Sequence, residues 1–121
     1  MPKKILLVDD TETVLMLEKM MLSGTGCEIE LAHNGEEALE KAPQYMPDLI
    51  FLDIMMPGMN GIDVCRHLKN DESTKDIPVI MVTTKGEPER VEEAFIAGCD
   101  DYLTKPVNKI ELLAKVKTHL E

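Results

Sequence analysis

Short apolar runs alternate along the chain with longer segments in which apolar residues recur at helical spacing. Most of the runs are continuous, as in Ile5-Leu6-Leu7-Val8, and a continuous run of this length is typical of a strand buried on both faces of a sheet. The run at 27–32 alternates with polar residues and predicts a more exposed strand. The expected strands span residues 5–8, 27–32, 48–53, 77–83 and 101–104.

A helix is expected after each strand. Asn34 followed by Glu37, and Asn108 followed by Glu111, match the capping-box pattern of a helix N-terminus. Thr11 is expected to cap the first helix. The expected helices run from Thr11 to about Ser23, from Asn34 to an end bracketed by Pro43 and Pro47, from Ile62 to Lys69, from Pro88 to Gly98, and from Asn108 to the last residues.

This alternation predicts an α/β fold with a parallel sheet and helices on both of its faces. Crossovers between parallel strands are expected to be right-handed. For five strand–helix units the expected topology is flavodoxin-like, (βα)5 with strand order 2-1-3-4-5. The 121 residues fit a single domain, 1–121, without a linker or a long insertion.

Composition narrows the range of functions. The net charge of −10 disfavours direct binding to nucleic acid or to anionic membranes. The three cysteines are widely spaced, form no CxxC pair and are expected to be free thiols, as in a cytoplasmic protein. The chain contains no apolar run long enough for a membrane span, and its start does not resemble a signal peptide.

Acidic residues stand where the first and third strands end. Asp9 and Asp10 follow the first strand, and the third ends on Asp53, ahead of turn-forming residues at 57–61. In the order 2-1-3-4-5 these strands are neighbours at the switch point, where open parallel sheets bind ligands. Three adjacent carboxylates need a cation, and hard oxygen ligands suit Mg²⁺ or Mn²⁺. The alternative, a helix-capping role, fits Asp9 or Asp10 alone better than both beside Asp53.

Two further polar residues are expected at the same edge of the sheet. Thr83 ends the fourth strand and Lys105 follows the fifth. A lysine and a hydroxyl beside an acidic cluster with its cation suit phosphoryl transfer, in which catalysis is mostly positioning and charge neutralisation. Asp53 could then be the nucleophile and form an acyl phosphate. Each residue would be ordinary by itself, and their shared location at the strand ends is what indicates this chemistry.

Over essentially its whole length the chain resembles the receiver (REC) domain of two-component response regulators, in the single-domain form known from chemotaxis. The motifs that carry the resemblance follow one another in the family's order: Val8-Asp9-Asp10, Asp53-Ile54-Met55-Met56-Pro57-Gly58-Met59-Asn60-Gly61, Thr83 and Lys105-Pro106. The resemblance implies a phosphorylation-activated signalling switch. Asp53 would accept a phosphoryl group from a phosphohistidine on a sensor histidine kinase or a histidine phosphotransfer protein.

The resemblance also implies a ligand set for Mg²⁺. Asp10, Asp53 and the backbone carbonyl of Met55 would bind the ion, and Asp9 would do so through water. Relatives commonly have a cis bond at the position of Lys105-Pro106.

The resemblance further implies how phosphorylation would be transmitted. Lys105 would pair with the phosphoryl oxygens, Thr83 would donate a hydrogen bond to them, and Tyr102 matches the switch aromatic that turns inward when the threonine moves. Phosphorylation adds roughly −1.5 to −2 charges. This charge would repack the surface of the fourth helix, fifth strand and fifth helix, which would bind the target protein, with the chain a monomer or a phosphorylation-dependent dimer.

Other functions are less compatible with the motifs. A flavodoxin-type electron carrier needs a phosphate-binding loop where Asp9 and Asp10 stand, a haloacid-dehalogenase-type phosphatase needs a DxD pair there, and no P-loop motif is present. The alternative that stays open is a receiver-like interaction module that acts without phosphorylation. Turnover of a separate substrate is not expected, beyond the chain's own phosphorylation and slow dephosphorylation.

Residues around Asp53 also bear on how fast its acyl phosphate would be hydrolysed. We hypothesise that Met55 and Thr84 hinder water and lengthen the lifetime of the acyl phosphate. Lys85 is basic where some relatives are acidic. No further domain is expected after residue 121, so the signal would leave through surface contacts.

The first helix is unusually apolar. Its residues predict either a wide core stripe with some exposed methionine or a docking patch for a kinase that includes Leu15 and Leu17. The apolar residues are Val14, Leu15, Met16, Leu17, Met20, Met21 and Leu22. The scattered histidines are expected to be solvated or capping residues. They are His33, His67 and His119.

Overall fold

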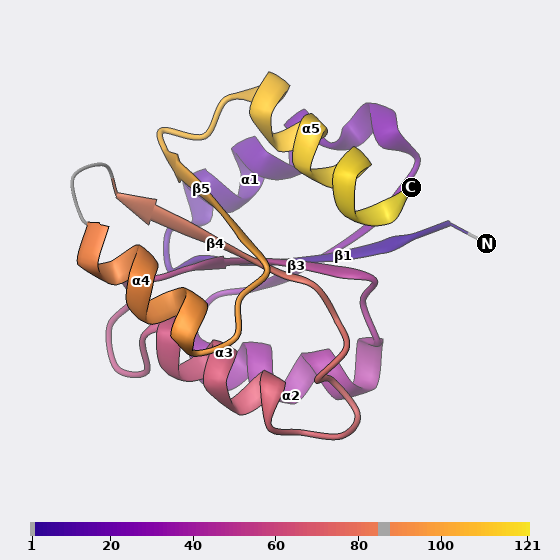
Figure 1. Ribbon diagram of the computed structural model, residues 1–121. Coiled ribbons are helices and arrows are strands. Elements are labelled where there is room, and N and C mark those ends of the chain that lie inside the picture. The colour runs from indigo at the N-terminus through magenta and orange to yellow at the C-terminus, as the bar shows by residue number, and fades with distance from the viewer. Residues whose placement is uncertain (1, 85–87) are drawn as a thin grey trace.

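The computed structural model describes residues 2–84 and 88–121. Five parallel strands form one sheet in the order β2-β1-β3-β4-β5, as predicted (Figure 1). The strands are β1 (Lys4–Val8), β2 (Glu28–Ala32), β3 (Leu49–Asp53), β4 (Val79–Thr84) and β5 (Asp101–Lys105). Each expected strand is therefore present, and only its ends shift by one or two residues. The predicted turn at Lys85-Gly86-Glu87 lies outside the described residues.

Helices cover both faces of the sheet (Figure 1). They are α1 (Glu12–Met21), the short 3₁₀ helix η1 (Ser23–Thr25), α2 (Gly35–Tyr45), α3 (Gly61–Lys69), α4 (Pro88–Ile96) and α5 (Lys109–Leu120). Helices α1 and α5 lie on one face, and α2, α3 and α4 lie on the other. Of the helices in the described part of the chain, none is both long and apolar enough to span a membrane.

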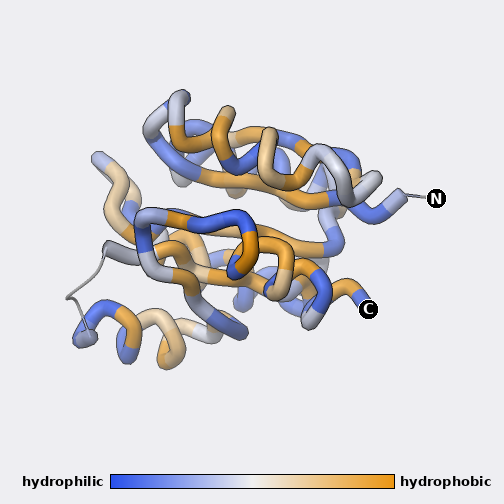
Figure 2. The backbone as a smooth tube through the Cα atoms, turned by 90° about the horizontal axis from the view of Figure 1, so that it is seen from above, coloured by the Kyte–Doolittle hydropathy of each residue, from blue (hydrophilic) through white to orange (hydrophobic). Residues whose placement is uncertain are grey.

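Alternate residues of the central strands feed two separate hydrophobic cores. In β1, Leu6 packs in the core under α2–α4, whereas Ile5 and Leu7 pack in the core under α1 and α5. The same alternation separates Ile50 from Phe51 in β3. Both faces of these strands are therefore buried, which explains why their sequences are continuous apolar runs (Figure 2).

The predicted end of the second helix is confirmed, whereas the predicted start of the fourth strand was wrong. Helix α2 ends at Tyr45, between Pro43 and Pro47, and closes with Met46 in the left-handed conformation; Pro43 itself lies inside the helix. Ile77 and Pro78 precede β4, because the Ile77 N–H donates to Thr74 in a turn and Pro78 has no N–H to give to the sheet.

Of the three predicted helix caps, those of Asn34 and Asn108 are confirmed and that of Thr11 is not. Asn34 and Asn108 accept the N–H of Glu37 and of Glu111, each at 2.8 Å, so both capping boxes are confirmed at the N-cap residue. Thr11 occupies the N-cap position of α1, but its side chain makes no capping hydrogen bond.

Helix α1 exposes apolar residues and buries an acid. Leu15 and Leu22 are fully buried, and Glu18, which lies between them on the same stripe, is only 3% exposed. Leu15 is therefore a core residue, and its expected place in a docking patch was wrong. The outer face of α1 instead presents Met16, Leu17 and Met20, which are 44%, 50% and 66% exposed.

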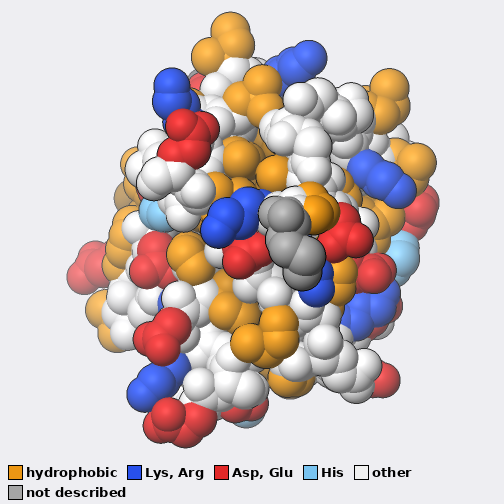
Figure 3. All heavy atoms as spheres, turned by 90° about the vertical axis from the view of Figure 1, so that its right-hand side faces the viewer, with side chains coloured by type: hydrophobic (Ala, Val, Ile, Leu, Met, Phe, Trp, Pro, Cys, Tyr) orange, Lys and Arg blue, Asp and Glu red, His pale blue; other side chains and the backbone are white. Residues whose placement is uncertain are grey.

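The chain termini and the predicted site residues lie at opposite ends of the sheet. The end at the right of Figure 1, where both chain termini lie, faces the viewer in Figure 3 and shows acidic, basic and hydrophobic side chains intermixed. The strands' carboxyl ends lie at the opposite end of the molecule, where the predicted site residues gather.

Gly61 holds the start of α3 against the strand that carries Asp53. Its N–H donates to the Ile54 carbonyl at 2.8 Å, and a Cβ at this position would overlap the Asp53 carbonyl oxygen. We expect Gly61→Ala to lower the free energy of unfolding by about 1–3 kcal/mol, because backbone atoms must move to admit the methyl group. Urea denaturation measures this change.

Gly24→Ala is the matched control for this substitution. No heavy atom lies within 4 Å of a Cβ built at Gly24. The control should change the free energy of unfolding by no more than about 0.5 kcal/mol. Equal effects of the two substitutions would contradict the close approach at Gly61.

Candidate functional site

Three carboxylates meet at the carboxyl ends of β1 and β3. The two strands pair in parallel with Val8 opposite Leu52, so the next residues along the chain, Asp9 and Asp53, stand side by side at the edge of the sheet. One oxygen each of Asp9, Asp10 and Asp53 lies within 4.8 Å of the others. Asp9 and Asp53 are buried, at 1% and 3% exposure, whereas Asp10 is exposed. The predicted acidic cluster is therefore present.

Lys105 brings a positive charge to this cluster from the edge strand β5. Its Nζ lies 3.0 Å from Oδ2 of Asp9 and 3.4 Å from Oδ1 of Asp53. Lys105 is the last residue of β5, two strands away from β3, so its side chain reaches past the end of β4. The following peptide bond, Lys105-Pro106, is cis, as the resemblance implied.

Burial and charge shift the pKa values of this ion pair. Burial raises the pKa of Asp53 to about 6, the Asp9 carboxylate adds to the increase, and the Lys105 ammonium opposes it. Burial lowers the pKa of the Lys105 ammonium, but its hydrogen bond to Asp9 and the charges of Asp53 and Asp9 outweigh this effect and raise it. Asp53 is thus a buried carboxylate that a neighbouring cation would stabilise.

Thr83 and Tyr102 lie on the adjoining strands β4 and β5 and differ in exposure. Thr83 is 2% exposed, and its hydroxyl donates a long hydrogen bond of 3.4 Å to the Thr84 carbonyl. Tyr102 is 42% exposed, and its ring meets the edge of Phe95 with 6.1 Å between the ring centroids. The Thr83 side chain is therefore buried at the end of β4, whereas the ring of Tyr102 is exposed on the outer side of β5.

Met55 follows the acid in the loop between β3 and α3. Its side chain is 46% exposed, at the rim of the cluster. The carbonyl of the preceding residue, Ile54, accepts the N–H of Gly61, which fixes the turn around Met55. The Met55 carbonyl as a metal ligand stays a prediction. Thr84 is exposed beside the site, and Lys85 lies outside the described residues.

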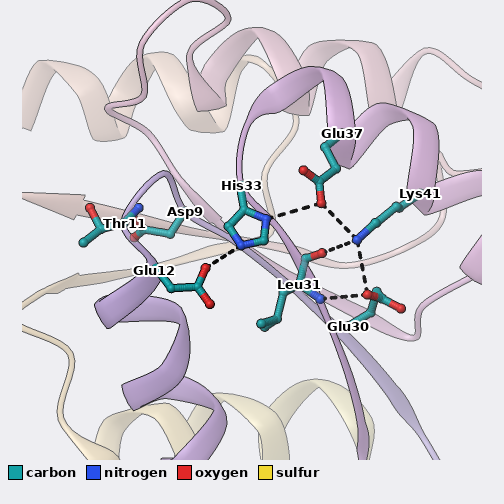
Figure 4. Close-up of polar contacts among 8 residues, drawn as sticks. All are labelled: Asp9, Thr11, Glu12, Glu30, Leu31, His33, Glu37 and Lys41. Carbon is teal, nitrogen blue, oxygen red and sulfur yellow. Dashed lines mark hydrogen bonds and ion pairs between the residues drawn. The ribbon is translucent and has the colours of Figure 1, made fainter.

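His33 connects the rim of the site to α2, which the sequence did not predict. Its Nε2 lies 2.6 Å from Glu12 of α1, and its Nδ1 lies 3.4 Å from Glu37 of α2 (Figure 4). Lys41 extends the network to Glu37 at 2.9 Å and to Glu30 at 3.2 Å. The hydrogen bond to Glu12 is the main reason why the pKa of His33 is raised. These contacts hold the start of α1 against the end of β2.

Glu18 is a second residue near the site that sequence reasoning missed. Burial raises its pKa to about 7, Asp9 raises it further, and Lys105 acts against them. Its spacing from Leu15 and Leu22, three and four residues, was the available signal. An acid in the core stripe of an amphipathic helix is unusual, because a buried carboxylate normally has a partner.

The raised pKa of Asp53 predicts a pH-dependent effect of Asp53→Asn. Between the ordinary carboxyl pKa of 3.8 and about 6, the folded protein keeps a proton that the unfolded chain has lost, so wild-type stability falls as the pH rises through this range. Without divalent cations, Asp53→Asn should therefore be more stable than the wild type at pH 7.5, by on the order of 1–3 kcal/mol.

Urea unfolding in a chelator at pH 7.5 and at pH 3.5 measures this difference, which should disappear at the lower pH. The exposed Asp76 is the control, and Asp76→Asn should not stabilise the protein at either pH. A destabilised Asp53→Asn at pH 7.5 would show that the pair with Lys105 outweighs the burial of Asp53.

Comparisons with known proteins agree with this geometry. The family model for the response regulator receiver domain matches residues 5–117. Protein PilG of Pseudomonas aeruginosa is 38% identical over 117 residues, which cover 97% of this chain and 87% of PilG. The crystal structure of chemotaxis protein CheY4 of Vibrio cholerae superposes with a TM-score of 0.92 at 32% identity, covering 98% of this chain and 99% of CheY4.

Other relatives are much longer than this chain. ResD of Bacillus subtilis, a transcriptional regulatory protein, is 43% identical over 117 residues, which cover 97% of this chain but only 48% of ResD. The response regulator PleD of Caulobacter vibrioides is 40% identical over 119 residues, covering 98% of this chain and 26% of PleD. The chain thus spans between a quarter and half of these relatives, and it belongs to the family of response regulator receiver domains, the signalling switches of two-component systems.

Proposed function

We propose that Asp53 accepts a phosphoryl group from a phosphohistidine of a sensor histidine kinase or a histidine phosphotransfer protein, in a reaction that depends on Mg²⁺. The observation that carries this proposal is the cluster of Asp9, Asp10 and Asp53 with Lys105 at the carboxyl ends of the strands. Phosphoryl transfer depends on positioning and on charge neutralisation, and this cluster provides groups for both.

The donor atoms of the cluster fit a hard divalent cation. They are carboxylate oxygens close enough together to share one ion, and they would repel each other without it. Asp9, Asp10, Asp53 and the Met55 carbonyl would bind Mg²⁺, or Mn²⁺ in its place. The ion would neutralise charge on the transferring phosphoryl group.

The side chains have defined tasks in this reaction. A carboxylate oxygen of Asp53 attacks phosphorus, a P–O bond forms, and the P–N bond to the donor imidazole breaks. The electron pair of that bond returns to the imidazole nitrogen. Lys105, already 3.4 Å from Asp53, would hold the phosphoryl oxygens, and the Thr83 hydroxyl would donate a hydrogen bond to one of them.

Phosphorylation would be transmitted to the surface formed by α4, β5 and α5. Phosphorylation places roughly −1.5 to −2 charges at one point, which attracts Thr83 and Lys105. Tyr102 lies on β5, the strand that pairs with Thr83's strand β4, and its ring would turn inward when Thr83 moves. The exposed apolar side chains here are those of Phe95, Ile96, Tyr102 and Ile110. They would bind a target protein or a second phosphorylated copy.

The other apolar surface suits the phosphodonor. Met16, Leu17 and Met20 lie on the exposed face of α1, whose first turn follows directly after Asp10. A kinase or phosphotransfer protein docked there would bring its histidine close to Asp53. We expect the protein to act in the cytoplasm, to bind no nucleic acid itself because of its acidic charge, and to turn over no separate substrate.

Phosphorylation can be tested with a small phosphodonor. Incubation with acetyl phosphate and Mg²⁺ should produce a band shift on a Phos-tag gel, and Asp53→Ala should abolish it because the acceptor carboxylate is gone. Chelation of Mg²⁺ should abolish the shift in the wild type. Asp76→Ala, at an exposed loop residue, is the control and should keep it. An unmodified wild type would favour an interaction module that acts without phosphorylation.

The lifetime of the phosphorylated state gives a second test. Met55 and Thr84 are both exposed beside Asp53, where they can hinder an attacking water. Met55→Asn and Thr84→Ala should therefore each dephosphorylate severalfold faster, measured as decay of the shifted band after the donor is removed. Met46→Asn, half exposed but far along the sheet, is the control. Unchanged lifetimes would rule out shielding by these side chains.

A further inference from the structure

Glu18 is a buried ionisable residue that the proposed reaction does not use. It is 3% exposed and lies on the core stripe of α1, between the fully buried Leu15 and Leu22. Among the described residues, no hydrogen bond or ion pair to its carboxyl group is present. A carboxyl group that is buried without a partner is costly, whereas an apolar residue would complete the stripe. Its presence therefore calls for a reason other than packing.

Helix geometry inclines the buried Glu18 side chain toward the end of α1 that lies next to the site. Long side chains on a helix lean toward the helix N-terminus, and the N-terminus of α1 directly follows Asp10. The charges that act on Glu18 are those of Asp9, Lys105 and Asp53, which come from three different strands. Glu18 thus lies on the face of the sheet that α1 and α5 cover, where the charges of the Lys105 ion pair act on it.

Lys105 has to share its acceptors with a divalent cation. Its Nζ uses Oδ2 of Asp9 and Oδ1 of Asp53, and both residues belong to the cluster that would bind Mg²⁺. Two cations close to the same oxygens repel each other. With an ion bound there, the ammonium would share these oxygens with the ion, and before phosphorylation no phosphoryl oxygen would be present to replace them. Lys105 is nonetheless needed at this spot for the transfer.

We propose that Glu18 is a positioning residue for Lys105: its buried carboxylate is a second acceptor that keeps the ammonium in the site when Mg²⁺ occupies the aspartates. The flexible four-carbon stem of Lys105 allows the ammonium to move from the aspartates to an acceptor on α1. Glu18 then pairs with Lys105 in the ion-bound site and releases it to the phosphoryl oxygens after transfer. The inference rests on the metal site proposed above.

A double-mutant cycle on Mg²⁺ affinity tests this role. Isothermal titration calorimetry at pH 8, above the pKa of about 7, compares the wild type, Glu18→Gln, Lys105→Met and the double variant. Loss of Glu18 should weaken Mg²⁺ binding roughly three- to tenfold when Lys105 is present, because the displaced ammonium has no acceptor. In the Lys105→Met background the same change should have less than a twofold effect, since no ammonium has to be held.

A spectroscopic readout accompanies the cycle. In the Mg²⁺-bound wild type, the Lys105 ammonium should give a slowly exchanging side-chain signal in ¹⁵N NMR, assigned by its absence in Lys105→Met. Glu18→Gln should lose that signal. Glu18→Leu, which completes the apolar stripe of α1, should fold at least as stably as the wild type and should show the same weaker Mg²⁺ binding. This variant separates positioning from packing.

The outcomes are distinguishable. An equal loss of affinity in both Lys105 backgrounds would show that Glu18 acts directly on the cation, and no loss in either would show that it only fills space; both results overturn the proposal. If the wild type binds no Mg²⁺ at all, the metal site itself fails. If it binds Mg²⁺ and is phosphorylated while the Glu18 variants behave like the wild type, only the positioning role fails.

Discussion

A single ammonium group balances the carboxylates gathered at the carboxyl ends of β1 and β3. Lys105 lies 3.0 Å from Asp9 and 3.4 Å from Asp53, and both carboxylates are almost completely buried. Acids this close together and this poorly solvated need a counter-charge to stay ionised. The counter-charge comes from the edge strand β5, so the balance extends across the sheet. A change of charge at Asp53 therefore acts on the strand that borders the exposed surface of α4, β5 and α5.

The parallel sheet is what makes this arrangement possible. Crossovers through helices bring every strand's carboxyl end to the same edge, and the order β2-β1-β3-β4-β5 makes β1 and β3 neighbours although a whole strand–helix unit separates them in sequence. The strands are buried on both faces and are held rigidly by two cores. The acids are thus held close together despite their repulsion, which a cation bound among them would relieve.

The sequence predicted the strands, two helix caps and the acidic cluster because each of these signals was local or followed from the strand order. The apolar runs gave five strands, the capping pattern placed Asn34 and Asn108, and the strand order brought Asp9 and Asp53 together. What it missed depended on tertiary contacts. Segments distant in sequence decide whether Thr11 makes a capping bond and which neighbours His33 contacts. The burial of each residue on α1 depends on how the helix packs against the sheet.

Helix α1 shows why an apolar count alone misleads. Its sequence is rich in leucine and methionine, yet the helix turns Leu17 and Met20 outward and Glu18 inward. The rotation is set by Leu15 and Leu22, which pack against β1, β3 and α5, and any residue at position 18 must follow them into the core. Docking thus buries a carboxyl group on which the charges of Asp9, Asp53 and Lys105 act. The same rotation presents an apolar surface beside the entrance to that site. One helix orientation therefore determines both which residue faces the groups around Asp53 and which apolar residues face outward beside them.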